Sequence, residues 1–220
     1  MIILITFEDI KKNEEIKTYI TQADNSLMSL GYTEHSFAHA TKVSDDAAYI
    51  LKSLNFSEHD IELARIAGYM HDIGNLVNRV DHSQSGAIMA FKILNDLQMN
   101  PKDIALIVSA IGNHDEGSGV AVNHIAAALI IADKSDVRRS RVRNVDDAKN
   151  DIHDRVNYSV KTSKLTVRDK NIILSLKIDT EISPVLEYFE IFLNRMKMCK
   201  NAARKLNIGF KLFINDQQLM

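Results

Sequence analysis

The stretch "GYMHDIGN", Gly68–Asn75, is the part of this sequence from which the fold is inferred. An apolar helical segment stops there on an adjacent His71–Asp72 pair and breaks at Gly74. The polar groups of a buried helix end must be satisfied, and a neutral imidazole beside a carboxylate is a suitable pair of metal ligands. Neighbours on a helix point about 100° apart, so the pair can hold one ion from two sides or bridge to a second ion. The interpretation depends on whether the rest of the chain supplies further ligands.

The composition favours a helical protein with a packed core. The chain has 220 residues, 45% of them hydrophobic, which suits one domain or one domain with a small addition. Gly and Pro are scarce, which favours helices over a turn-rich β fold. A formal charge of -2 gives no general attraction to nucleic acid or anionic membranes. The single cysteine, Cys199, excludes an internal disulfide and a cysteine-based zinc site.

The sequence predicts a cytoplasmic protein. The longest strongly apolar run, Ile125–Ala132, is far shorter than the roughly 20 residues that a membrane-spanning helix needs. The first residues, MIILITF, have neither a basic leader nor a small-residue cleavage site. We therefore expect a reducing compartment and no membrane partner.

Helical patterns fill the first two thirds of the chain. A capping box in TFED (6–9) opens the first predicted helix, and Ser57 and Ser83 are predicted caps of later ones. On the second helix, apolar or small residues share a face with His39. The predicted helices cover residues 9–30, 33–54, 57–72, 83–98, 101–112 and 124–136, and a short one begins near Asp146.

The pattern changes after about residue 155. The segments 155–167 and 171–179 are rich in β-branched residues and are typical of strands. An amphipathic helix over 183–207 begins with a serine cap and a proline in its first turn, and a final strand follows over 208–214. The fold class is therefore mainly α, with a helical domain over 1–154 and a small C-terminal β-β-α-β addition over 155–220.

Further ligand-type side chains lie where apolar helices meet loops. Singly, a histidine on a helix face is an ordinary core residue, and histidines in loops are ordinary surface residues. Asp133 differs, because an unpaired carboxylate after the apolar ALIIA is costly. Together with the pair at Gly68–Asn75, these positions favour a metal site. They are His39, His82, His114 and Asp133.

These residues resemble the HD-domain superfamily of metal-dependent phosphohydrolases. Its pattern is a His, an adjacent His-Asp pair and a distant Asp, and YMHDIGN resembles its central LLHDIGK, with Asn75 where a lysine is common. The segments 81–87, 111–119 and 129–136 resemble those that carry its other ligands. The resemblance covers about residues 30–145.

The resemblance implies an HD-domain helical bundle with one or two divalent transition-metal ions (Fe, Mn, Co, Ni or Zn). A set of imidazole and carboxylate ligands does not choose among these metals. Asp72 is the implied catalytic residue, as a ligand or as a base for the attacking water. The implied ligands of one ion are His39, His71, Asp72 and Asp133, with His82 and His114 on a second ion bridged by Asp72.

The expected substrate is a small phosphorylated molecule, in particular a nucleotide. The run DKSDVRRSRVR (133–143) carries five cations, of which Lys134 and Arg139 are candidates to bind phosphate. The run also suits a solvated helix end, and the absence of interleaved aromatic residues disfavours a nucleic-acid surface. His35, one turn before His39, is a candidate to contact substrate, to orient His39 or to lie at the surface.

Two other functions stay open at this point. Some HD-fold proteins with two irons are oxygenases, and bound mixed-valence iron with oxygen uptake would indicate that class. A metal-containing sensing module without turnover is disfavoured by the complete set of ligands. The C-terminal addition is a candidate surface for a homodimer or a lid.

Overall fold

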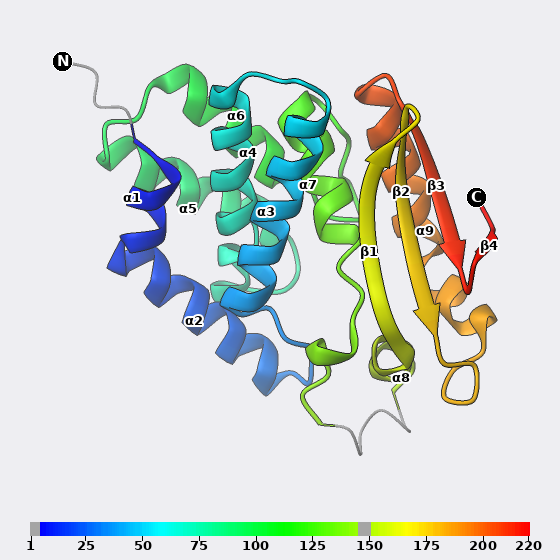
Figure 1. Ribbon diagram of the computed structural model, residues 1–220. Coiled ribbons are helices and arrows are strands. Elements are labelled where there is room, and N and C mark those ends of the chain that lie inside the picture. Colours follow the sequence, from blue (N-terminus) through cyan, green and yellow to red (C-terminus); the bar gives the residue numbers. More distant parts are fainter. Residues whose placement is uncertain (1–4, 145–150) are drawn as a thin grey trace.

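The structure is a computed structural model that describes residues 5–144 and 151–220. A bundle of helices stands beside a C-terminal layer of sheet and helix (Figure 1), which confirms the mainly α fold class. No helix in these two ranges is long and apolar enough to cross a membrane. The bundle contains α1 (Phe7–Lys12), α2 (Glu14–Ser29), α3 (Phe37–Ser53), α4 (Glu58–Met70), α5 (His82–Asp96), α6 (Pro101–Gly112) and α7 (His124–Lys134), with the 3-10 turns η1 (Ile73–Leu76) after α4 and η2 (Arg139–Arg141) after α7.

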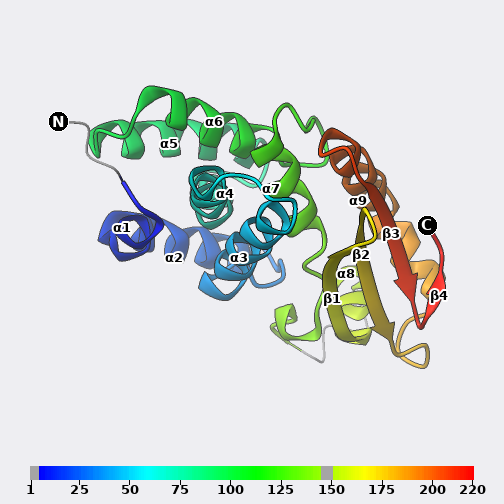
Figure 2. The ribbon, with the colours of Figure 1, turned by 45° about the horizontal axis from the view of Figure 1, so that its top comes forward.

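Two helices lie in the interior of the bundle. Figure 2 looks nearly along α4, which the other helices surround. Ile125–Ala132 of α7 is buried on every side, and α3, α4, α6 and α9 (Val185–Lys205) all pack against it. A helix that is hydrophobic all round belongs in a protein interior. The C-terminal ends of α4 and α7, which carry His71 and Asp133, therefore lie inside the molecule.

The C-terminal part contains α8 (Ile152–Ser159), β1 (Val160–Arg168), β2 (Asn171–Ile178), α9, β3 (Gly209–Ile214) and β4 (Gln217–Gln218). The strand order is β1-β2-β3-β4, with β2 antiparallel to β1 and parallel to β3. Helix α9 is the crossover between β2 and β3, and it packs against β3 and α7. The predicted β-β-α-β order is confirmed, and the two-residue β4 is an additional strand. The division of the chain between residues 154 and 155 stays a prediction.

Two predictions about helix ends in the helical part differ from the structure. The helix predicted over 9–30 is two helices, because Asn13 ends α1 and its side chain accepts the N–H of Ile16 to begin α2. Ser83 is not a cap, because α5 already begins at His82, after Asp81 with a φ of 56°. The capping box at 6–9 and the cap at Ser57 are confirmed.

The strand predicted from Arg155 begins only at Val160. Helix α8 takes the preceding residues, because Asp151 caps it by accepting the N–H of Asp154. The short helix predicted from Asp146 starts outside the described residues.

Gly74 lies where η1 and α5 make their closest approach. A Cβ at this position would be 2.0 Å from the carbonyl oxygen of His82 and 2.4 Å from the nitrogen of Gly86. Both atoms belong to the backbone, so no side-chain movement relieves the clash. The break after the His71–Asp72 pair therefore needs glycine.

We expect Gly74→Ala to lower the free energy of unfolding by about 3 kcal/mol, because the clash separates η1 from α5. Urea unfolding measures this. Gly112→Ala is the matched control, since its Cβ would lie 3.6 Å from the Cβ of Ala87, an ordinary contact. Equal urea midpoints for Gly74→Ala and the wild type would contradict the close approach.

Candidate metal centre

The six side chains predicted as ligands meet at one place inside the bundle. Each is carried there by a helix end, by the residues just after one or by the first turn of a helix. The four histidines are at most 2% exposed. The residues are His39 in the first turn of α3, His71 and Asp72 after α4, His82 at the start of α5, His114 just after α6 and Asp133 in the last turn of α7.

The first group of ligand atoms lies between α3, α4 and α7. His39 Nε2 is 3.3 Å from His71 Nε2 and 3.4 Å from Asp133 Oδ1. Asp72 Oδ2 is 3.6 Å from His39 Nε2 and 3.2 Å from His71 Nε2. The two imidazoles therefore lie between two carboxylates.

The second group uses the other oxygen of Asp72. His82 Nε2 is 3.1 Å from His114 Nε2, and these atoms are 3.4 Å and 3.8 Å from Asp72 Oδ1. Asp115 Oδ1 lies 4.0 Å from His82 Nε2 on the outer side. Asp72 thus faces one histidine pair with each of its carboxylate oxygens, as a bridging ligand would.

Backbone carbonyls fix the orientation of three of these rings. The Nδ1 atoms of His71, His82 and His114 lie 2.8, 3.1 and 2.6 Å from the carbonyl oxygens of Gly68, Arg79 and Ile111. A carbonyl can only accept, so each Nδ1 carries the hydrogen. In the neutral rings, Nε2 then presents a lone pair to the centre of the cluster.

When all four rings are neutral, the ligand atoms that face one another in the cluster are therefore all acceptors. Neighbouring acceptors repel unless a proton or a cation lies between them, so this set of ligand atoms suits a metal ion. With metal–ligand distances of about 2.1 Å, neighbouring ligands lie about 3.0–3.4 Å apart in octahedral or tetrahedral sites. The separations of 3.1 to 3.8 Å within the two groups are close to this range. The residues therefore fit divalent transition-metal ions.

His39 is oriented by a carboxylate instead of a carbonyl. Its Nδ1 is 2.7 Å from Oδ2 of the buried Asp136, whose Oδ1 accepts a hydrogen bond from Arg138 Nε at 2.8 Å. Burial raises the pKa of Asp136, but the bond to His39 and the nearby Arg141 and Arg138 hold it below its usual value. A carboxylate in this position increases the basicity of a metal-binding imidazole.

The two groups differ in how they bind protons when no metal is present. Burial lowers the pKa of His71, but Asp72 and Asp133 outweigh burial and raise it to about 10. Burial lowers the pKa of both His82 and His114. The ring of His71 therefore holds an extra proton at neutral pH, whereas the rings of His82 and His114 are neutral.

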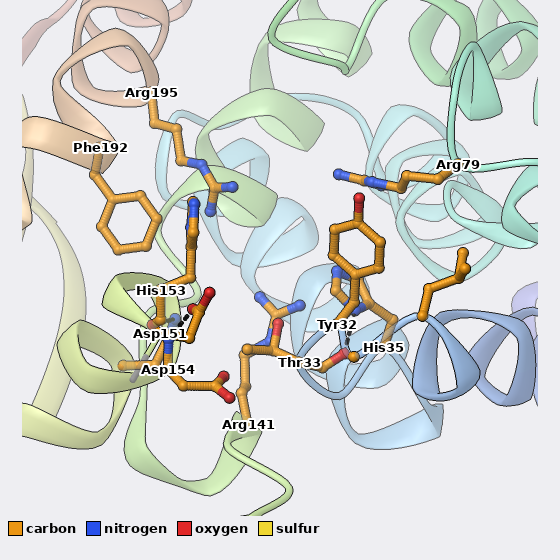
Figure 3. A pocket seen from close by; sticks show the side chains of 13 residues that line it. Tyr32, Thr33, His35, Arg79, Arg141, Asp151, His153, Asp154, Phe192 and Arg195 are labelled. Carbon is orange, nitrogen blue, oxygen red and sulfur yellow. Dashed lines mark hydrogen bonds between the residues drawn. The ribbon is translucent and has the colours of Figure 1, made fainter. Parts of the chain in front are cut away.

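Positive charges line the opening beside the ligand atoms. A small cavity over Asp72 is lined by Lys134, Arg79, Arg141 and Arg195. It continues into a pocket of about 540 Å³ that shares the three arginines and His35 (Figure 3). The arrangement combines acceptors that suit cations with donors that suit an anion.

Two of the three residues predicted to bind substrate line this cavity, and the third does not. Lys134 Nζ donates to Asp133 Oδ2 at 2.6 Å. His35 Nδ1 donates to the carbonyl of Thr33, so its Nε2 is an acceptor suited to a substrate hydroxyl. Arg139 turns to α8, where its Nε donates to the carbonyl of Tyr158 and its guanidinium covers the ring of Tyr158 at 4.4 Å.

Sequence reasoning missed several residues of the site. Asp136 and Asp115 had a signal in the local sequence. Asp136 follows a predicted ligand by three residues, and Asp115 follows another directly. Arg141 lies in the basic run 133–143, and Arg79 precedes His82 by three residues. Arg195 had no local signal, because it reaches the pocket from α9.

Comparison with known proteins gives distant relatives. The uncharacterized protein MJ1020 of Methanocaldococcus jannaschii is 25% identical over 164 residues, which cover 62% of this chain and 61% of that protein. The crystal structure of a predicted HD superfamily hydrolase from an uncultured Thermotogales bacterium has a TM-score of 0.44 and 23% identity, over 56% of this chain and 67% of that one. That structural likeness is too weak to carry an argument.

The family comparison is stronger. The model of the HD domain family matches residues 36–148, slightly more than half of the chain. The matched range contains all six side chains of the cluster. This chain belongs to the HD domain family.

Proposed function

We propose that this protein is a phosphohydrolase that uses divalent metal ions to cleave a phosphoester of a small molecule, a nucleotide in particular. The family and the His–Asp clusters support the coarser assignment, a metal-dependent hydrolase. The phosphoester specificity is the finer step, and it rests on the positive charges around the pocket.

One observation carries the proposal: Asp72 lies between two histidine pairs, directly beside a group of cations. Its oxygens are 3.2 Å from His71 Nε2 and 3.4 Å from His82 Nε2. The cavity at this carboxylate is also lined by Lys134 and Arg141. A phosphoester presents to such a site both a centre for attack by water and oxygens that need positive charge.

The side chains divide the reaction between them. When bound at the two groups, divalent ions would activate water and polarise the phosphoryl group. Asp72 orients the attacking water. Burial raises the pKa of Asp72, but the neighbouring His71 holds it well below its usual value, which favours an orienting role over that of a base. Lys134, Arg79 and Arg141 bind the phosphoryl oxygens, and His35 accepts a substrate hydroxyl.

The outer pocket supports a substrate of nucleotide size. Its volume of about 540 Å³ lies within the usual range of about 300–1,000 Å³ for small-molecule sites. Tyr32, which is 43% exposed, contributes a ring with the guanidinium of Arg79 at 5.6 Å. An aromatic ring and several donors suit a flat base attached to a phosphate.

We expect Asp72→Asn to lower phosphate release from nucleotides by about 1,000-fold or more, because metal-assisted catalysis contributes several kcal/mol. Colorimetric phosphate assays on metal-loaded protein measure this, with circular dichroism to check folding. Asp103→Asn is the matched control, since Asp103 pairs with His59 away from the site. Oxygen uptake by the iron-loaded wild type without phosphate release would instead establish an oxygenase.

We expect His82→Ala to reduce the bound metal from two ions per chain to one, because it removes a ligand of the second group only. Elemental analysis of protein purified without chelator measures the metal content. His124→Ala should keep both ions, since its Nε2 pairs with Asp60 at 2.8 Å outside the cluster. Unchanged metal content in His82→Ala would rule out a second ion at this position.

We expect the first ion to displace about one proton at pH 7.5. The pKa of His71 is about 10 in the metal-free protein, so its ring is protonated there and must lose the proton to bind metal. Apparent affinity should rise about tenfold per pH unit and level off near pH 10. Calorimetry in buffers of different ionisation enthalpy counts the protons. If the proton were released when the second ion binds instead of the first, the assignment of this proton to His71 would be contradicted.

A further inference from the structure

We propose that Arg195 binds the phosphate of the substrate and that it makes the site selective for phosphate monoesters over diesters. The inference rests on the proposed phosphohydrolase function and deepens it. Arg195 belongs to α9, outside the range matched by the HD domain family. It nevertheless lines both the small cavity over Asp72 and the larger outer pocket.

The side chain of Arg195 is held in place at its inner edge. Its Nε donates to the carboxylate of Glu116, which follows the ligand His114 by two residues. Its guanidinium also lies over the ring of the buried Phe192, 4.5 Å from the ring centroid. A planar guanidinium fixed in this way loses little conformational entropy when it binds a second anion.

The outer edge of Arg195 has its donors available. Neither Nη1 nor Nη2 makes a hydrogen bond within residues 5–144 and 151–220. These two groups form the fork that binds two oxygens of one phosphate. Figure 3 shows the guanidinium groups of Arg195, Arg79 and Arg141 directed at the same opening from three sides.

The other three cations of the cavity each use a terminal donor within the protein and keep only part of their donors for a substrate. Arg141 donates from Nε to the carbonyl of Glu34 and from Nη1 to the carbonyl of Asp136. Arg79 Nη1 donates to Asn75 Oδ1 at 3.2 Å. The charge of Lys134 is paired with that of Asp133. Among the three arginines of the cavity, Arg195 alone has both Nη groups without a hydrogen bond in the described part of the chain, and these can face one phosphate end-on.

The fork suits a monoester better than a diester. A phosphate monoester carries about two negative charges at neutral pH and has three terminal oxygens, so oxygens remain for the fork after others face the metal groups. A diester carries one charge and two terminal oxygens, and its second organic group stands where the third oxygen would be. Loss of Arg195 should therefore affect monoesters more.

The test uses the metal-loaded full chain and inorganic phosphate as the probe. We expect Arg195→Gln to weaken phosphate binding in calorimetry by about 10- to 100-fold, the range for a lost charged hydrogen bond. Arg195→Lys keeps the charge without the fork and should give a smaller loss. Arg204→Gln is the matched control, because Arg204 is exposed in the last turn of the same helix and should leave binding unchanged.

Kinetics with para-nitrophenyl phosphate and bis-para-nitrophenyl phosphate test the selectivity. Arg195→Gln should lower kcat/KM for the monoester by about 10- to 100-fold and leave that for the diester within about threefold. The proposal would be overturned if Arg195→Gln bound phosphate as tightly as the wild type does. It would also be overturned if kcat/KM fell equally for both esters. If phosphate binding depends on Arg195 but neither ester is hydrolysed, the proposed phosphohydrolase function is refuted. The proposal that Arg195 binds phosphate then still stands.

Discussion

With neutral imidazoles, the ligand atoms that face one another at the centre of the bundle are all acceptors, and the surrounding structure serves to hold them there. The last carbonyls of a helix have no partner within the helix. In α4 and α6, Gly68 and Ile111 offer such carbonyls to the Nδ1 atoms of His71 and His114. The same hydrogen bonds satisfy the helix ends and aim Nε2 at the cluster. This explains why an apolar helix can end in the interior on a histidine and an aspartate.

The pocket that results has two chemically opposite sides. The carboxylates and imidazoles at its base suit cations, whereas the guanidinium and ammonium groups around its opening suit an anion. Buried charges are stable only when they are paired and hydrogen-bonded. Asp133 with Lys134, and Asp136 with Arg138, meet this requirement within the protein itself. The site is therefore organised by its own charges.

Local sequence signals were sufficient for most of the helices and for the position of the cluster. Capping residues and apolar periodicity placed α4, α6 and α7, and each ligand lies at or near the end of such a segment. The break at Asn13 was missed because one residue both ends a helix and begins the next. The strand predicted from Arg155 was too long because α8 depends on a cap at Asp151.

The walls of the pocket were harder to predict, because tertiary packing decides them. The basic run after Asp133 ends in the 3-10 turn η2, so helical spacing does not say which of its side chains share a face. Arg141 consequently lines the cavity and Arg139 turns away from it. Arg195 comes from a helix that joins two strands, far along the chain from every ligand. No pattern within the family range contains that information.

The position of α7 has a consequence for the order in which the protein can mature. All six cluster residues have been synthesised once the ribosome has passed Asp133. Helix α7, however, also packs against α9, which ends at Lys205. A nascent chain without α9 exposes apolar surface of the helix that carries Asp133, and such surface favours association with chaperones or other chains. The cluster is therefore enclosed by its full set of packing partners only after α9 has been made, well after its own six residues.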